Sequence, residues 1–217
     1  MNKILSAGLV LLLVLGAFYA LNAADNVANT KHNLSSSGTG TYKTTSTTEI
    51  CIMCHTPHSA ALNVALWNKT DPSGPYNMYN SSTIDMVSSS APQLQSLACL
   101  ACHDGANAFD ALLNSPGSGN NPVNWQWNYD LNKIPSGEPT NLGVNLANDH
   151  PVGTQYDPTK DTAFNPVVNG KVYELPIFGP DGRVECASCH NVHDNQFPPF
   201  LRVSNSASEL CKRCHIK

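Results

Sequence analysis

The stretch Cys51-Ile52-Met53-Cys54-His55 decides how this chain folds, because the same pattern returns three more times. The other copies are Cys99-Leu100-Ala101-Cys102-His103, Cys186-Ala187-Ser188-Cys189-His190 and Cys211-Lys212-Arg213-Cys214-His215. The four copies use all eight cysteines of the 217-residue chain, and a histidine directly follows each Cys-x-x-Cys pair. The cysteines therefore act in pairs, and each pair acts together with its own histidine.

Cys-x-x-Cys-His is the pattern of covalent haem c attachment. Two thiols three residues apart lie on one face of a helical turn, so both can add to the vinyl groups on one porphyrin edge. The adjacent histidine is then the proximal iron ligand. The sequence predicts four haem c groups. The predicted attachment residues are Cys51, Cys54, Cys99, Cys102, Cys186, Cys189, Cys211 and Cys214, and the predicted proximal ligands are His55, His103, His190 and His215.

Three other uses of cysteine compete with haem attachment. A disulfide scaffold predicts irregular spacing and no linked histidine. A zinc site needs four ligands rather than a histidine after every cysteine pair. Iron–sulfur clusters also use thiolates, but not this repeated pentapeptide. The haem interpretation alone accounts for every cysteine and for the histidine that follows each pair.

Four of the eight histidines lie outside the motifs, one for each predicted iron. Methionine is the other common distal ligand, but only Met78 and Met86 lie outside the N-terminal segment and the motifs. We therefore expect two histidines at every iron, which leaves no open coordination position for a substrate. A plain surface role is the alternative for each of these histidines. The predicted distal ligands are His32, His58, His150 and His193.

Local sequence refines the expected roles of three of these histidines. His58 and His193 each follow a proximal histidine by three residues. Such a residue cannot readily reach the far side of its own haem, so we expect both to ligate neighbouring haems. Pro151 gives His150 an extended or turn backbone. Asp149 or a backbone carbonyl is then expected to accept the second ring N–H of His150.

The first residues predict export. Residues 1–3 are a short basic start, residues 4–21 carry no charge, and alanines precede Asp25. We predict a signal peptide over residues 1–23, cut after residue 23 or 24, and one tetrahaem cytochrome c domain over residues 24–217. An uncleaved membrane anchor is the alternative. The cleaved chain is expected to be secreted, extracellular or at the cell surface, with no membrane span in its mature part.

Composition indicates the fold class. With 12 Lys and Arg against 16 acids and a net charge of −4, the chain has no basic stripe for nucleic acid. The 15 prolines and 14 glycines predict many turns, and the apolar runs are short. We expect a multihaem cytochrome c that is mostly coil and turns, with short helices around the motifs and few strands. The haems are expected to form much of the core, and helices are predicted over residues 93–113 and 207–215.

Several stretches resemble the multihaem c-type cytochromes that carry doubled Cys-x-x-Cys-His motifs. They are Cys51–His58, Asp149–Val152, and Cys186–His193 followed by Phe200–Arg202. With its tetrahaem size, export signal and early lone histidine, the chain is similar to the tetrahaem extracellular cytochromes of the OmcE type, which polymerise into filaments, or nanowires. The resemblance implies a homopolymer that carries electrons to redox partner proteins and external acceptors. It also implies that His32 ligates a haem of the adjacent subunit.

We expect electron transfer rather than enzymatic catalysis, and three alternatives remain. A monomeric periplasmic tetrahaem shuttle has the same haem chemistry. A multihaem reductase subunit needs an iron with an open axial position, which the histidine count argues against. A membrane-anchored quinol-oxidising cytochrome requires residues 4–21 to stay uncleaved.

Overall fold

The computed structural model places most of the chain after the predicted signal. The predicted signal peptide, residues 1–23, and its cut site lie outside the described residues, so both remain predictions. Within the described part of the chain, no helix is long and apolar enough to cross a membrane. The described residues are 26–61, 64–72, 74–117, 124–129 and 132–216.

Regular structure is short and scattered, as the composition predicts. The α-helices are α2 (Leu94–His103), α3 (Cys186–Cys189) and α4 (Glu209–Cys214). The 3-10 helices are η1 (Val27–Asn29), η2 (Cys51–Met53) and η3 (Ser206–Ser208). Two antiparallel strand pairs complete the set: β1 (Thr154–Gln155) with β4 (Arg183–Val184), and β2 (Lys171–Val172) with β3 (Leu175–Pro176). The expected fold of coil and turns with few strands is confirmed.

Each attachment motif lies in a helical turn, which also confirms the expected short helices. The second motif occupies the C-terminal part of α2. In the first, third and fourth motifs, the histidine N–H donates to the carbonyl of the first cysteine at 2.7, 3.1 and 2.9 Å. A turn of this kind brings residues three apart to one face, as attachment to a single porphyrin edge requires.

The predicted helix over residues 93–113 is too long. α2 ends at His103, because Gly105 adopts a positive φ of 69° and turns the chain out of the helix. A Cβ on Gly105 would lie 2.1 Å from Nδ2 of Asn141, so the close approach of that side chain also requires glycine. The helix predicted over residues 207–215 is present as the end of η3 followed by α4.

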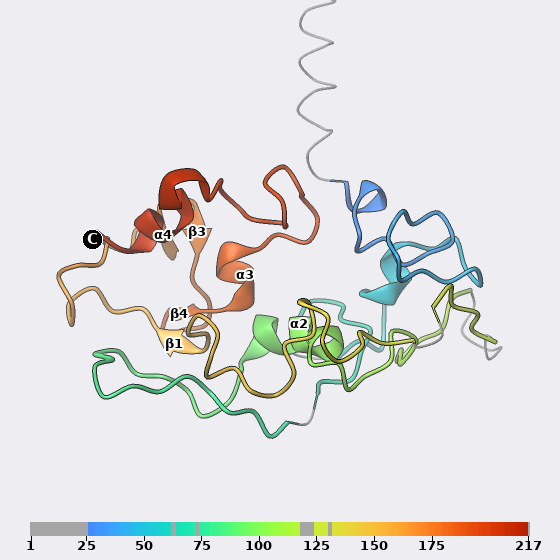
Figure 1. Ribbon diagram of the computed structural model, residues 1–217, viewed down its shortest axis with the longest axis horizontal. Coiled ribbons are helices and arrows are strands. Elements are labelled where there is room, and N and C mark those ends of the chain that lie inside the picture. Colours follow the sequence, from blue (N-terminus) through green and yellow to red (C-terminus); the bar gives the residue numbers. More distant parts are fainter. Residues whose placement is uncertain (1–25, 62–63, 73, 118–123, 130–131, 217) are drawn as a thin grey trace, which may run out of the picture.

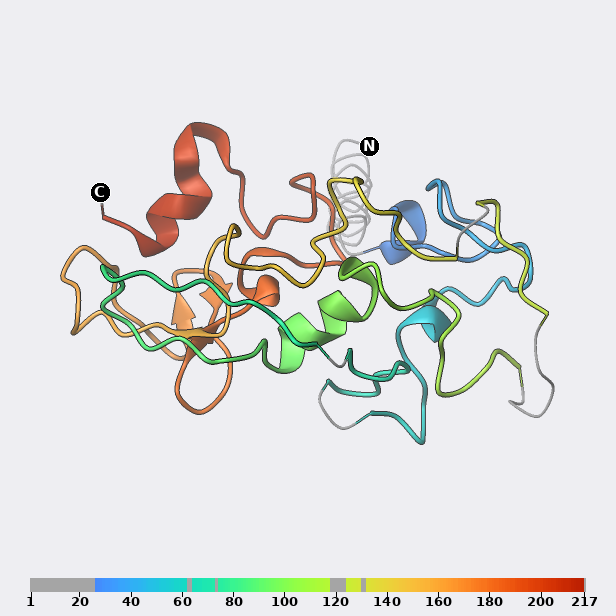
Figure 2. The ribbon, with the colours of Figure 1, turned by 60° about the horizontal axis from the view of Figure 1, so that its bottom comes forward.

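The four motif helices follow one another across the molecule. Figure 1 shows η2 in the N-terminal part at the right, α2 and α3 near the middle, and α4 at the left. The turned view in Figure 2 keeps this order. The segment between α2 and α3 runs back across the molecule, so that β1 pairs with β4 beside α3. Motifs that are far apart in the sequence are thereby brought into one row.

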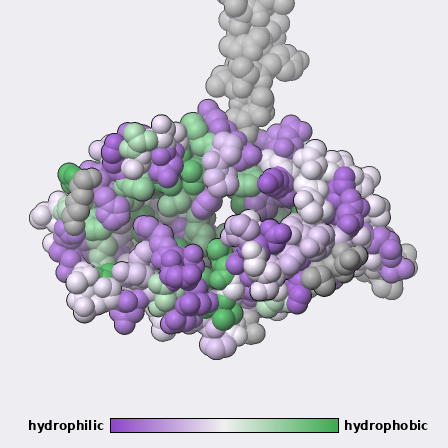
Figure 3. All heavy atoms as spheres, viewed as in Figure 1, coloured by the Kyte–Doolittle hydropathy of each residue, from purple (hydrophilic) through white to green (hydrophobic). Residues whose placement is uncertain are grey.

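The apolar core is small for the length of the chain. Figure 3 shows apolar residues gathered along the middle of the drawn face, with polar residues around them. The short apolar runs of the sequence predict a small aliphatic core, and the structure has one. Among the described residues, the buried apolar side chains are Met53, Leu100, Ala101, Phe109, Ile134, Leu146, Tyr156, Val172, Leu175 and Val203.

Candidate functional site

Three pairs of imidazoles each join one motif histidine to one histidine outside the motifs. Because a bond between a metal and an imidazole nitrogen is about 2 Å long, two imidazoles on opposite faces of one iron have ring centroids about 6 Å apart. The observed separations match this value, so the residues fit a haem iron held between two histidines. The pairs are His32 and His103 at 6.1 Å, His55 and His193 at 6.1 Å, and His150 and His215 at 6.5 Å.

His32 lies inside the protein beside the second motif. Its ring packs edge-on against Phe200 with centroids 4.5 Å apart, and its buried Nδ1 has no hydrogen-bond partner. Burial, with smaller contributions from the nearby His103, His193 and His190, lowers the pKa of His32 to about 4. The ring is therefore neutral, the form in which imidazole binds metals. His32 lies against His103 of its own chain, which differs from the adjacent-subunit role that the resemblance implied.

His193 lies against the first motif, although it follows the third motif in the sequence. Its ring is nearly parallel to that of His55, with an interplanar angle of 19°. Trp67 contacts the His55 ring edge-on, with centroids 5.9 Å apart. The two Cys-x-x-Cys-His-x-x-His segments are therefore linked through space, and the imidazole of one faces the motif histidine of the other.

His150 lies against the fourth motif. Its Nδ1 is 3.1 Å from the carbonyl oxygen of Pro151, so a backbone carbonyl rather than Asp149 is the ring partner. The His215 ring also contacts Phe164, with centroids 4.6 Å apart. A hydrogen bond at Nδ1 leaves Nε2 available as a metal ligand and fixes the ring orientation.

Two motif histidines have the same arrangement at Nδ1. The Nδ1 atom of His103 is 2.8 Å from the carbonyl of Thr140, and that of His190 is 3.1 Å from the carbonyl of Pro199. His190 is exposed and has no imidazole partner among the described residues. His58 is also exposed, and its ring has no ring contact or side-chain hydrogen bond in the described part of the chain. These two histidines remain when the three pairs are assigned.

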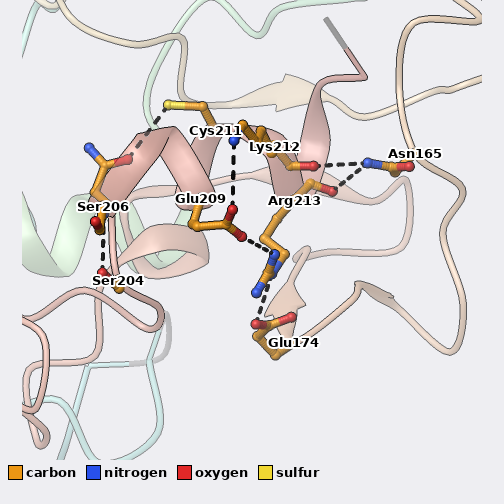
Figure 4. Close-up of polar contacts among 9 residues, drawn as sticks. Asn165, Glu174, Ser204, Ser206, Glu209, Cys211, Lys212 and Arg213 are labelled. Atoms are coloured by element: carbon orange, nitrogen blue, oxygen red, sulfur yellow. Dashed lines mark hydrogen bonds and ion pairs between the residues drawn. The ribbon is translucent and has the colours of Figure 1, made fainter.

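Polar contacts hold the fourth motif in place (Figure 4). The Arg213 guanidinium donates to Glu174 at 2.9 Å and to Glu209 at 3.0 Å. Nδ2 of Asn165 donates to the carbonyl of Lys212 at 3.0 Å and to that of Arg213 at 3.2 Å. The ion pairs are partly exposed and contribute little stability each. The Arg213–Glu174 ion pair and the Asn165 hydrogen bonds link α4 to the loops that precede it, whereas the Arg213–Glu209 ion pair lies within the helix.

The attachment cysteines of successive motifs are neighbours. None of the eight cysteines forms a disulfide bond. Burial, together with a nearby thiol of the second motif, raises the pKa of Cys54 to about 12. A hydrogen bond between Cys99 and Cys186 raises the pKa of Cys99 and lowers that of Cys186. Burial, together with a nearby thiol of the third motif, raises the pKa of Cys214 to about 11. The motifs thus lie next to one another from the first to the fourth.

Two buried charged residues near the attachment motifs were not predicted from the sequence. Lys69 and Glu185 are each only 2% exposed. Lys69 lies in a segment with no motif of its own, so the sequence gives no signal for it. Glu185 directly precedes the third motif, but its burial depends on the packing of α3 against α2.

Comparison with known proteins supports the haem interpretation. Residues 180–217 match the family model described as the doubled CXXCH motif. The match covers the third and fourth motifs, and the first two carry the same pentapeptide pattern. It supports a multihaem c-type cytochrome that binds haem c covalently and transfers electrons. No curated protein sequence matches the chain. No group of three or more His, Cys, Asp and Glu side chains in the described ranges is placed to hold a metal ion by itself.

Proposed function

We propose that this protein transfers electrons through four covalently bound haem c groups, each with two histidine ligands. Haem c supplies a reversible one-electron iron couple. The observation that carries the proposal is the set of three imidazole pairs, each with the separation that a shared iron requires. Two imidazoles per iron leave no position for a substrate, so we propose that the protein does no bond-making chemistry.

His58 and His190, which are left outside the three pairs, are the proposed fourth ligand pair. His193 already crosses from the third motif to the first. His58 has the same position after the first motif and is free to cross in the opposite direction to His190. This reciprocal exchange links the two doubled motifs. The remaining iron, at the second motif, then takes His32 of the same chain. The proposed ligand pairs, from the first motif to the fourth, are His55 with His193, His103 with His32, His190 with His58, and His215 with His150.

The proposed electron route across the subunit follows the attachment cysteines, because thiols of successive motifs are neighbours. The hydrogen-bonded thiols of Cys99 and Cys186 bring the second and third attachment sites together at the junction of α2 and α3. Thiols of the first and second motifs, and of the third and fourth, are also neighbours. The protein thus holds its attachment sites in one uninterrupted row.

Exposed apolar residues favour assembly into a homopolymer. Leu66 and Leu113 are exposed near the first motif, where Leu66 accepts a backbone hydrogen bond from Thr56. Tyr173 and Ile216 are exposed beside the fourth motif, where the Arg213 guanidinium lies 5.6 Å from the centroid of the Tyr173 ring and Ile216 follows His215. Figure 1 shows α4, which carries the fourth motif, at the opposite side of the molecule from η2. Two different surfaces at opposite ends form a head-to-tail contact, which continues as an open filament when the rotation does not close. Such a filament would extend the haem row from subunit to subunit.

This assembly defines the proposed setting of the protein. We propose that it is exported and carries electrons at or beyond the cell surface to external acceptors, with redox proteins as donors. The alternative is a monomeric periplasmic shuttle, which has the same ligand pairs but makes only transient contacts with its partners.

Electron microscopy of haem-stained material released from the surface of expressing cells tests the proposal. We expect filaments that contain this protein, and we expect Tyr173→Glu combined with Ile216→Glu to give monomers that keep four haems. Leu142→Glu is the matched control, because this exposed leucine lies beside α2, where its N–H donates to the His103 carbonyl at 2.7 Å. Monomers in the unmodified protein, still with four haems, would support the shuttle. Fewer than four haems on each chain would contradict the four-haem proposal itself.

A further inference from the structure

Lys69 places a positive charge between the first two attachment motifs. The N–H of Asn68 donates to the carbonyl of Cys54 at 2.9 Å, which ties this segment to the first motif. The ammonium of Lys69 donates to the carbonyl of Phe109 at 2.7 Å, in the segment that follows the second motif. No carboxylate in the described ranges lies within ion-pair distance of it. Because the interior of a protein has a lower dielectric constant than water, a buried ammonium acts more strongly on neighbouring groups than an exposed one.

Glu185 places a negative charge between the second and third motifs. Its Oε2 accepts a short hydrogen bond from the hydroxyl of Ser96 in α2. The same hydroxyl accepts from the N–H of Cys186 at 3.0 Å, so the carboxylate is fixed at the α2–α3 junction. Its Oε1 is buried and has no hydrogen-bond partner in the described part of the chain.

The charged groups around Glu185 do not cancel it. Arg183 lies nearby but forms its ion pair with Asp181, and no basic side chain among the described residues lies within ion-pair distance of Glu185. The Cys186 thiol also lies near Glu185, and thioether formation would make this thiol neutral. Asp104 and Lys69 both lie near the Cys102 thiol, and the Asp104 carboxylate accepts hydrogen bonds from the Tyr76 hydroxyl and from the N–H of Ala106.

Buried charges act directly on a neighbouring redox centre. Reduction adds one electron to an iron, so a nearby positive charge favours the reduced form and a nearby negative charge disfavours it. Solvent ions screen buried charges far less than exposed ones. We propose that Lys69 and Glu185 set a gradient along the haem row, in which Lys69 raises the reduction potentials of the first and second haems and Glu185, which directly precedes Cys186, lowers chiefly that of the third.

The gradient gives the row a preferred direction. Each hop oxidises one iron and reduces the next, with no bond made and no proton transferred. Electrons then run downhill from the third haem toward the first, from the α3 side of the molecule to the η2 side. This inference rests on the proposed function, because it needs haems at the first three motifs.

Spectroelectrochemical titration of the full-length holoprotein tests the gradient. Lys69→Met is expected to lower two of the four potentials, each by about a tenfold change in the ratio of reduced to oxidised iron, or about 59 mV. Glu185→Gln is expected to raise one potential by a similar amount. Lys160→Met and Glu138→Gln are the matched controls, because both residues are exposed, and they are expected to leave all four potentials unchanged.

Two further variants keep the test decisive if Lys69→Met fails to assemble. Lys69→Gln keeps a polar donor without the charge and is expected to lower the same two potentials, whereas Lys69→Arg keeps the charge and is expected to preserve them. Unchanged potentials in Lys69→Gln and Glu185→Gln, or shifts of the same sign in both, would overturn the gradient. A wild-type protein without four low-spin haem signals would instead overturn the proposed function.

Discussion

Replacing His32 with alanine is the sharpest single test of the ligand assignment. Among the described residues, the His32 ring is the only imidazole paired with His103, at a centroid separation of 6.1 Å, and its buried Nδ1 has no hydrogen-bond partner there. The other two observed pairs do not involve either ring. The substitution therefore removes one axial ligand from one iron of the proposed four and leaves the other three with two imidazoles.

The size of the spectral change follows from the loss of one axial ligand at one of four haems. We expect one quarter of the low-spin haem signal to become high-spin, and we expect the reduced variant to bind one equivalent of carbon monoxide per chain. Absorption and electron paramagnetic resonance spectra of the purified protein give the first number, and a carbon monoxide titration gives the second. His32→Met is the control, because a thioether restores six-coordination and raises the potential of that one haem relative to two imidazoles.

The same variant separates a ligand within the chain from a ligand to the next subunit. A ligand within the chain predicts that His32→Ala still assembles and that the spectral change is the same in isolated subunits and in filaments. Four intact low-spin signals with no carbon monoxide binding would refute the pairing of His32 with His103. A low-spin signal lost only when subunits separate would restore the adjacent-subunit role.

Three other perturbations have expected outcomes. Burial raises the pKa of Glu185 to about 6, so its carboxylate ionises between pH 5 and 7. One haem potential should fall as the pH rises through this range, and the fall should be absent in Glu185→Gln. Ser96→Ala removes the hydrogen bonds to Glu185 and to the N–H of Cys186. Denaturant titration should show a loss of about 2–4 kcal/mol, whereas an unchanged midpoint would show that this network is not structural. Chain produced without haem attachment should show no cooperative thermal unfolding, because the core depends on the cofactors; a sharp transition would contradict a haem-based core.

Local features of the fold could be predicted from the sequence. Each Cys-x-x-Cys-His turn depends only on a few consecutive residues, so the helical turns at the motifs were predicted. The early end of α2 also had a local signal, because Gly105 follows His103 closely and glycine favours the positive φ that ends a helix. The helix predicted over residues 93–113 was too long because it continued past this glycine.

The pairing of the histidines could not be predicted from local sequence. His32 lies far from His103 along the chain, and His193 lies even farther from His55. Their contacts depend on how the segment between α2 and α3 returns across the molecule. The number of distal candidates follows from counting the histidines, but their partners do not. For His32 the resemblance implied a different partner from the one the structure brings near.

Buried charge is also a property of the tertiary structure. Lysine and glutamate are normally exposed, and nothing in the residues next to Lys69 predicts that its ammonium is enclosed. Its burial arises because Asn68 binds the first motif while the Lys69 ammonium binds the carbonyl of Phe109. Glu185 is enclosed by α2, a helix that precedes it by a long stretch of chain.

Intact-mass measurement of the purified, denatured protein tests the central claim most directly. Covalent attachment survives denaturation, so the mass counts the haems on each chain without reference to their ligands or to assembly. The four motifs predict the mass of the polypeptide plus four haem groups. A mass that corresponds to fewer haems, or to the bare polypeptide, would contradict a tetrahaem electron-transfer protein.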